Sequence, residues 1–138
     1  MSQPKGIISI IVNGKGMAYQ LEINQQGDIL MARASGQRTR QAVLAMAMEI
    51  LKVCIERQCS KVLVDVRELE GFLDTLNSYQ VATDDLSKMR GKGLNKAAIV
   101  DRKRGTETHR FFETVARNRG FNLRMFINLK DAIAWLRK

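Results

Sequence analysis

Hydrophobic and polar residues alternate strictly near the start of the chain. Tyr19, Leu21 and Ile23 are separated by single polar residues, and this period of two predicts a half-buried β-strand. A Gln-Gly-Asp turn follows at residues 26–28, and a second apolar run covers residues 29–34. Two strands joined by a short turn of this composition predict a β-hairpin.

A separate apolar run precedes the hairpin at residues 7–12, and a turn-rich stretch ends it at residues 13–16. We therefore expect residues 1–16 to be an edge strand or an arm, and residues 17–138 to be the compact domain. An unpaired apolar edge strand also pairs readily with a second copy, so a homodimer is an open alternative.

Four later stretches have the period of amphipathic helices. The first has one continuous apolar face, made by Val43, Ala47, Ile50, Leu51 and Cys54. Residues that commonly cap helix N-termini stand at the start of each stretch. The helices are expected at residues 39–58, 74–90, 106–119 and 129–136, capped by Thr39, by Asp74, by Thr106 or Thr108, and by Asn128.

Between these helices lie three short apolar runs at residues 61–66, 96–101 and 123–127. The first two show little alternation, which is typical of strands covered on both faces in a parallel sheet. Strands that alternate with helices predict an α/β fold with crossover connections. We expect one α/β domain with a mixed, mostly parallel sheet of four to six strands, flanked by about four helices.

Composition narrows the class of protein further. The chain has 138 residues, which suits one domain. It contains no apolar run of membrane-spanning length and no secretory signal. Cys54 and Cys59 have no histidine near them, so the spacing predicts neither a zinc site nor a disulfide scaffold. We expect a cytoplasmic protein with reduced thiols, no metal and no cofactor.

The net charge of +9 is unevenly distributed. Residues 1–86 hold 9 Lys/Arg and 10 Asp/Glu, whereas residues 87–138 hold 14 Lys/Arg and 4 Asp/Glu. A nonspecific nucleic-acid binder is one interpretation of this excess. No recognition motif for RNA or DNA accompanies it, however, so specific readout is not predicted.

The predicted hairpin and three later segments together resemble the STAS superfamily (sulphate transporter and anti-sigma-factor antagonist). The later segments are residues 62–71, residues 112–126, and residues 131–136 with their Trp-Leu ending. The resemblance is to the bacterial branch of small stand-alone domains, grouped with lipid-transfer-type folds, and covers residues 17–138. It implies a sheet flanked by helices, and a function in binding rather than catalysis.

The resemblance also implies a switch. Well-known family members change partner when a serine in an Asp-Ser-Ser-Gly-like sequence is phosphorylated. Asp74 and Thr75 match the Asp-Ser pair only if one extra residue is allowed, and the following Ser-Gly is missing. A phosphate on Thr75 would meet the free N–H groups of a helix N-terminus. The alternative is that Asp74 simply caps the helix.

A basic loop after the strand at residues 96–101 is the strongest candidate for an anion site. In open α/β sheets, ligands bind at the carboxyl ends of the strands. Cations, hydroxyls and helix N–H groups together suit a phosphate or carboxylate. The alternative is a solvated loop with an ordinary N-cap. We expect His109, the only histidine, to be a surface residue in the first turn of the helix. The candidate anion-binding residues are Arg102, Lys103, Arg104, Gly105, Thr106, Thr108 and His109.

An enzyme is the least favoured class. Asp65 and Asp101 both stand near the carboxyl ends of predicted strands, which would bring them close together. No nucleophile or acid–base partner accompanies them or His109 in the sequence, and Cys54 fits a packing role.

We therefore predict a non-enzymatic regulatory or interaction module that binds a protein partner or an anionic ligand. A lipid or lipid-head-group binder is the alternative. The stretch at residues 73–94 has basic and apolar positions, and in related lipid-transfer folds an equivalent helix covers an apolar cavity.

Overall fold

The computed structural model describes residues 19–71, 73, 77, 80–81, 93–102 and 106–138. Residues 1–16, Asp74 and Thr75 therefore lie outside the described part, and the expectations about them stay predictions. The elements, in chain order, are β1 (Tyr19–Gln26), β2 (Ile29–Gln37), α1 (Arg40–Arg57), β3 (Lys61–Glu70), β4 (Lys96–Val100), α3 (Thr106–Asn118), β5 (Leu123–Phe126) and α4 (Leu129–Leu136).

The strands form one sheet in the order β1-β2-β3-β4-β5. Strands β1 and β2 are the predicted antiparallel hairpin, and every later pairing is parallel. This confirms the predicted mixed, mostly parallel α/β fold. The backbone of three helices, α1, α3 and α4, is described over their whole length. Of the helix predicted at residues 74–90, only Asn77, Gln80 and Val81 are described, and all three have helical backbone geometry.

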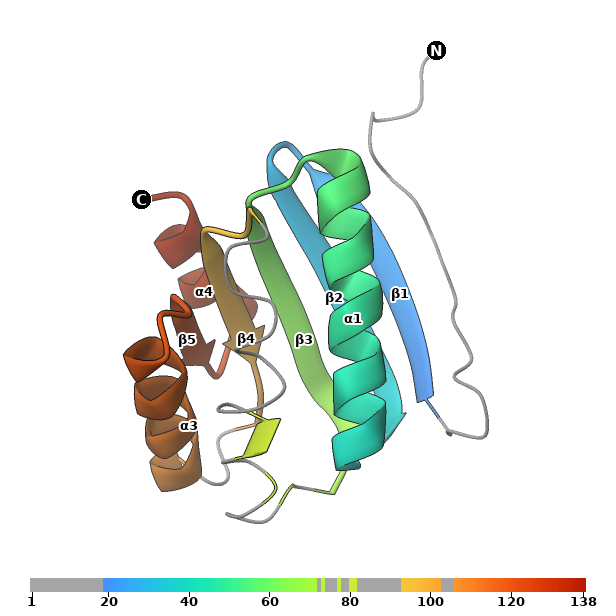
Figure 1. Cartoon of the computed structure of the whole chain (residues 1–138), viewed down its shortest axis with the longest axis vertical. Helices are drawn as coiled ribbons and strands as arrows, with labels where there is room; N and C mark the ends of the chain where they lie inside the picture. Colours follow the sequence, from blue (N-terminus) through green and yellow to red (C-terminus); the bar gives the residue numbers. More distant parts are fainter. Residues whose placement is uncertain (1–18, 72, 74–76, 78–79, 82–92, 103–105) are drawn as a thin grey trace.

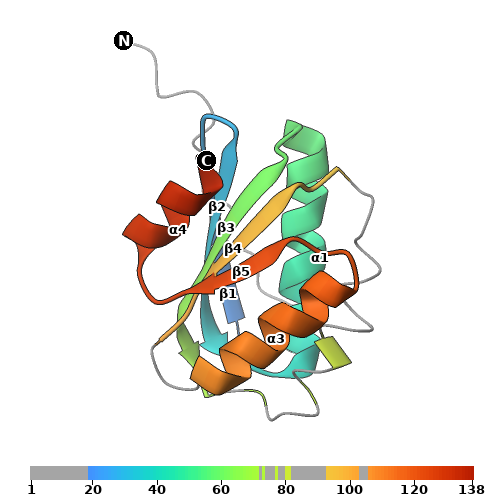
Figure 2. The same cartoon turned by 90° about the vertical axis from the view of Figure 1, so that its left-hand side faces the viewer.

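The helices form a layer on each face of the sheet (Figures 1 and 2). Helices α1 and α3 cover one face, and α4 covers the opposite face. Crossovers between parallel strands are right-handed, so crossovers that advance across the sheet in one direction place their helices on the same face. Helix α4 follows the last strand and does not connect two strands, so the handedness of crossovers does not decide which face it covers.

Side-chain caps fix two helix starts at the predicted positions. The Thr39 hydroxyl accepts a hydrogen bond from the Ala42 N–H at 3.0 Å, and the Asn128 amide oxygen accepts one from the Asp131 N–H at 2.9 Å. Gly120, with φ 82°, ends α3 in the left-handed conformation expected of a C′ glycine. These local signals confirm the helix boundaries.

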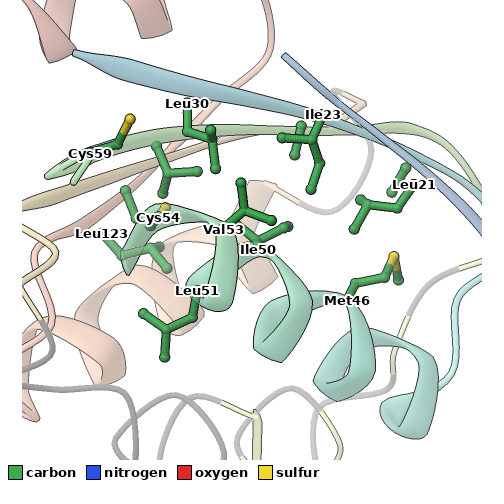
Figure 3. Packing of buried hydrophobic residues seen from close by; sticks show 14 of the residues in the cluster. Leu21, Ile23, Leu30, Met46, Ile50, Leu51, Val53, Cys54, Cys59 and Leu123 are labelled. Atoms are coloured by element: carbon green, nitrogen blue, oxygen red, sulfur yellow. The ribbon is translucent and has the colours of Figure 1, made fainter. Parts of the chain in front are cut away.

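The larger core lies between the sheet and α1. Figure 3 shows Ile50 and Val53 pointing from α1 toward the sheet, where Leu30 and Ile23 meet them. All four side chains are buried. The predicted apolar face of α1 is confirmed at Ile50, Leu51 and Cys54, whereas Val43 and Ala47 are only partly buried.

A β-bulge in β3 decides which of its side chains face α1. Arg33 pairs with Asp65 but Ser35 pairs with Glu68, so β3 has one extra residue at this point. The extra residue reverses the alternation, and Leu69 is therefore buried in the same core as Val62. The strand continues to Glu70, whereas the sequence predicted an end at residue 66. The prediction was too short because the bulge interrupts the alternation of buried and exposed residues.

The smaller core lies under α4. Ala132 and Leu136 are buried against the sheet. The Trp135 ring packs against Phe126 with centroids 5.8 Å apart, and the Lys96 ammonium lies 5.0 Å from the Trp135 ring centre. The Trp-Leu ending of the chain is thus a packing motif that fastens α4 to the sheet.

Candidate functional site: an apolar cavity with a polar end

An apolar cavity of about 350 Å³ lies between α1 and α3, over β3, β4 and β5. Its walls are mainly aliphatic and aromatic side chains. One wall is the face of α1 predicted from the sequence, which explains why Val43 and Ala47 on that face are only partly buried. The remaining walls include Val64, Ile99, Phe112 and Leu123.

Three polar side chains, Arg38, Asp101 and His109, also line this cavity. Arg38 directly follows β2 and Asp101 directly follows β4. Because parallel strands end at the same edge of a sheet, the topology brings Arg38 and Asp101 together. His109 lies on α3, the helix that follows β4. The carboxyl ends of the strands are the place where a ligand site is expected in such a sheet.

Arg38 and Asp101 form a two-pronged ion pair. The Arg38 guanidinium donates to Asp101 Oδ2 at 2.8 Å and to Oδ1 at 3.0 Å. It also donates at 3.2 Å to the carbonyl of Val66 in β3, the strand that lies between β2 and β4. Asp101 Oδ1 accepts a further hydrogen bond from the Arg102 N–H at 2.8 Å.

Asp101 is ionised in this environment. Burial raises the pKa of its carboxyl, but the hydrogen bonds from His109 and Arg38, the Arg38 charge and the Arg102 N–H outweigh burial. The net effect holds the pKa of Asp101 well below its usual value. A negative charge is therefore fixed at the edge of an apolar cavity.

His109 is buried rather than on the surface, so that expectation is wrong. Its Nε2 lies 3.2 Å from Asp101 Oδ2. The prediction placed His109 on the outer surface of the first helical turn, whereas the helix that begins at Thr106 turns its ring toward the end of β4. The carboxylate of Asp101 supplies the hydrogen bond that makes this burial favourable.

Asp65 does not join Asp101, which corrects the expectation that the two would be close. The register pairs Asp65 with Val100, so Asp65 and Asp101 project from opposite faces of the sheet. Arg67 binds the Asp65 carboxylate at 2.8 and 2.9 Å. Burial raises the pKa of Asp65, and the contacts with Arg67 outweigh it and lower the value.

The predicted anion-binding loop is only partly described. The Arg102 guanidinium donates to the carbonyls of Leu69 and Gly71, at 2.7 and 3.1 Å. Two of the predicted side chains, Arg102 and His109, are thus already engaged with the protein. Residues 103–105 and the side chains of Thr106 and Thr108 lie outside the described part, so the anion site stays a prediction.

A second hollow of about 330 Å³ lies at the edge of the sheet beside β5. Its lining is of mixed character and includes Arg110, Glu113, Arg124, Ile127 and Asp131. The Glu113 carboxylate accepts a hydrogen bond from the Met125 N–H at 2.8 Å, so a side chain of α3 satisfies one backbone donor of this edge strand. Ile127 is 47% exposed at the rim.

Cys54 lines the cavity as a free thiol. Burial, with a smaller contribution from Cys59, raises the pKa of Cys54 to about 12. The thiol is therefore protonated at neutral pH, in agreement with the packing role predicted for it. In the described part of the chain, no three His, Cys, Asp or Glu side chains gather as a metal site, and no helix is long and apolar enough to cross a membrane.

Sequence reasoning missed Arg38. Its signal is weak, because a single cation after a hairpin strand resembles any loop residue. A comparison of the residues that come directly after each strand would have found it. Arg38 comes directly after β2, and Asp101 comes directly after β4 in the same sheet.

Comparisons with protein-family models and with solved structures identify similar proteins. A family model described as SpoIIAA-like matches residues 29–137. A crystal structure of an anti-sigma factor antagonist from Mycobacterium paratuberculosis superposes with a TM-score of 0.56 at 17% identity, covering 88% of this chain and 96% of that one. An uncharacterized protein with a SpoIIAA-like fold from Shewanella loihica PV-4 superposes with a TM-score of 0.53 at 18% identity, covering 91% and 98%.

The comparison with curated proteins gives no match. The two structural likenesses show the fold, and the family match covers most of the chain. The resemblance to the STAS superfamily drawn from the sequence is thereby confirmed. This chain belongs to the SpoIIAA-like family.

Proposed function

We propose that this chain is a non-enzymatic regulatory module that acts by binding a protein partner. The observation that carries the proposal is the SpoIIAA-like family match over residues 29–137. A solved structure of the same fold is an anti-sigma factor antagonist, and by analogy we extend a role in protein interaction to this chain.

The polar groups of the cavity support a binding role. A nucleophilic mechanism needs a side chain activated by a neighbouring base. The Nε2 of His109 is directed to Asp101, and Cys54 keeps its proton because burial raises its pKa. Asp65 and Asp101 lie on opposite faces of the sheet and do not form a carboxylate pair.

We place the partner contact at the hollow beside β5. Arginine is one of the residues that contribute most to binding at protein interfaces. This hollow combines Arg110 and Arg124 with the exposed side chain of Ile127. Charges of both signs surround the apolar residue, which is the arrangement of a polar rim around a contact.

A capture experiment with three baits tests this proposal. Wild-type protein, Ile127→Asp and Met48→Asp are immobilised, and the proteins retained from an extract of the source cells are quantified. Met48 is the matched control, because it is 51% exposed on α1, away from the hollow. We expect a partner retained by the wild type and by Met48→Asp and lost with Ile127→Asp. Equal retention by all three baits would place the contact elsewhere.

We also propose that the loop at residues 102–109 contributes an anion-binding function to the same module. With Arg102 and His109 engaged in the protein, the groups proposed to hold the anion are Lys103, Arg104 and the N–H groups at the start of α3. A phosphate or a carboxylate of the partner suits these groups.

A second candidate function is the binding of a small apolar ligand, and the cavity is the observation that favours it. Binding sites for small molecules are concave and mostly apolar, with a few polar groups that orient the ligand. The cavity of about 350 Å³ lies within the size range of such sites. Titration with tert-butylbenzene, followed by the amide shifts of Ala97 and Leu123, tests this function. Shifts at these wall residues support it, and their absence at saturation contradicts it.

A further inference from the structure

We infer that the cavity between α1 and α3 takes a neutral, mostly apolar molecule with one hydroxyl group, which donates a hydrogen bond to Nδ1 of His109. The inference rests on the proposed ligand-binding function and specifies the chemistry of the ligand.

The apolar walls of the cavity require that most of the ligand is apolar. Val64 and Ile99 come from the middle of the sheet, and Phe112 and Leu123 close the side toward α3 and β5. Burial of the apolar surface of a ligand against these walls stabilises such a complex. A strongly polar molecule would lose its hydration against these side chains and gain no hydrogen bonds in return.

The polar end of the cavity requires a neutral head group. Arg38 and Asp101 are a matched pair of opposite charges, with side chains 10% and 2% exposed. Both Asp101 oxygens already accept hydrogen bonds, from Arg38, His109 and the Arg102 N–H. A cationic ligand would find this carboxylate already satisfied, and an anionic one would place a second negative charge beside it. Burying an uncompensated charge is costly, so a neutral ligand is preferred.

The hydrogen bond to Asp101 fixes the tautomer of His109. An ionised carboxylate only accepts hydrogen bonds, so Nε2 must carry the proton that lies between them. In neutral imidazole the other nitrogen, Nδ1, then has a lone pair and acts as an acceptor. Among the residues that the structure describes, no hydrogen bond to Nδ1 is found. A ligand hydroxyl is the neutral donor that matches this acceptor.

Three probes that share a tert-butylphenyl body test the inference on the wild-type protein at neutral pH. They are p-tert-butylphenol, tert-butylbenzene and p-tert-butylbenzoate, with affinities measured by calorimetry. We expect the phenol to bind about three- to tenfold more tightly than the hydrocarbon, which is the range for one net hydrogen bond. We expect the benzoate to bind at least about tenfold more weakly than the phenol, because its charge is uncompensated.

Two variants and one control variant locate the binding site. His109→Phe keeps the ring and removes the acceptor, so the advantage of the phenol over the hydrocarbon should disappear. Ala47→Phe fills the cavity from α1 and should abolish binding of the phenol and the hydrocarbon. Met48→Phe adds the same ring outside on the same helix and should leave both affinities unchanged.

The outcomes distinguish a failure of the inference about the hydroxyl group from a failure of the ligand-binding function on which it rests. If the hydrocarbon binds as tightly as the phenol, the hydroxyl inference is wrong while ligand binding stands. If the benzoate binds most tightly, the preference for a neutral head group is wrong. If no probe binds, or Ala47→Phe leaves binding intact, the cavity is not a ligand site and both fail.

Discussion

Arg38 and Asp101 are 63 residues apart in the sequence, yet two hydrogen bonds of 2.8 and 3.0 Å join their side chains. The pair spans β3, because Arg38 follows β2 and Asp101 follows β4, the strands on either side of β3. A third bond, from Arg38 to the Val66 carbonyl, ties β3 into the same contact. The pair thus ties β2, β3 and β4 together at the polar end of the cavity.

Removing Arg38 should destabilise the fold strongly. Arg38→Met leaves the buried Asp101 charge without its cation, and breaking a buried pair in this way costs about 3–5 kcal/mol. Arg33→Met is the matched control, because the Arg33–Glu68 pair is 3.5 Å apart with side chains 59% and 57% exposed. An exposed pair contributes at most about 1 kcal/mol. Urea unfolding measures both values, and equal losses for the two variants would refute a stabilising role for the buried pair.

The stability of the protein should fall as the solution is acidified. The pKa of Asp101 is lower in the folded protein than its unfolded value of about 3.9. Its ionised form therefore stabilises the fold above about pH 4, and this contribution is lost as the pH falls through the folded pKa. Urea unfolding from about pH 6 to about pH 3 should show the start of this loss, because the unfolded state takes up its proton at a higher pH than the folded state does. Asp101→Asn should be less stable at neutral pH and less sensitive to acid, and an unchanged acid sensitivity would contradict the assignment.

Glu113 should protect the edge of β5. Its carboxylate accepts the Met125 N–H at 2.8 Å, on the outer side of the last strand of the sheet. Glu113→Ala removes this acceptor, so we expect the Met125 amide to exchange with solvent deuterium about tenfold faster, as for the loss of about 1.4 kcal/mol of protection. Glu113→Gln keeps an acceptor and should retain most of the protection. Equal exchange in the wild type and Glu113→Ala would contradict this role.

Sulphate should bind at the start of α3 if the loop is an anion site. Titration at constant ionic strength should shift the amide resonances of residues 103–109, with the charge-reversal variant Lys103→Glu binding more weakly. Chloride at the same ionic strength is the control for general screening. Shifts confined to other parts of the chain would show that the loop is an ordinary solvated helix cap.

The sequence predicted the fold through local signals. The alternation at Tyr19, Leu21 and Ile23 gave the first strand, and Thr39 and Asn128 gave two helix starts, because a cap hydrogen bond involves residues only three apart. The length of β3 was missed, since its bulge becomes visible only when β2 is placed beside it.

The site was harder to predict than the fold, because its contacts join distant residues. Asp101 was noticed, but its partners Arg38 and His109 approach it only when the parallel sheet is assembled. The pairing of Asp65 with Asp101 failed for a simple reason. A shift of one residue in register places a side chain on the other face of a sheet, and register is not readable from one strand alone.

The claim that the cavity is a binding site is tested most directly by a crystal structure with p-iodophenol, whose iodine is located by its anomalous scattering. We predict one strong iodine peak between α1 and α3, beside Ile99 and Leu123, with the phenol oxygen within hydrogen-bond distance of His109 Nδ1. Ala47→Phe crystals soaked in the same way should lack this peak. An empty cavity in wild-type crystals, with iodine only on the surface, would contradict the account.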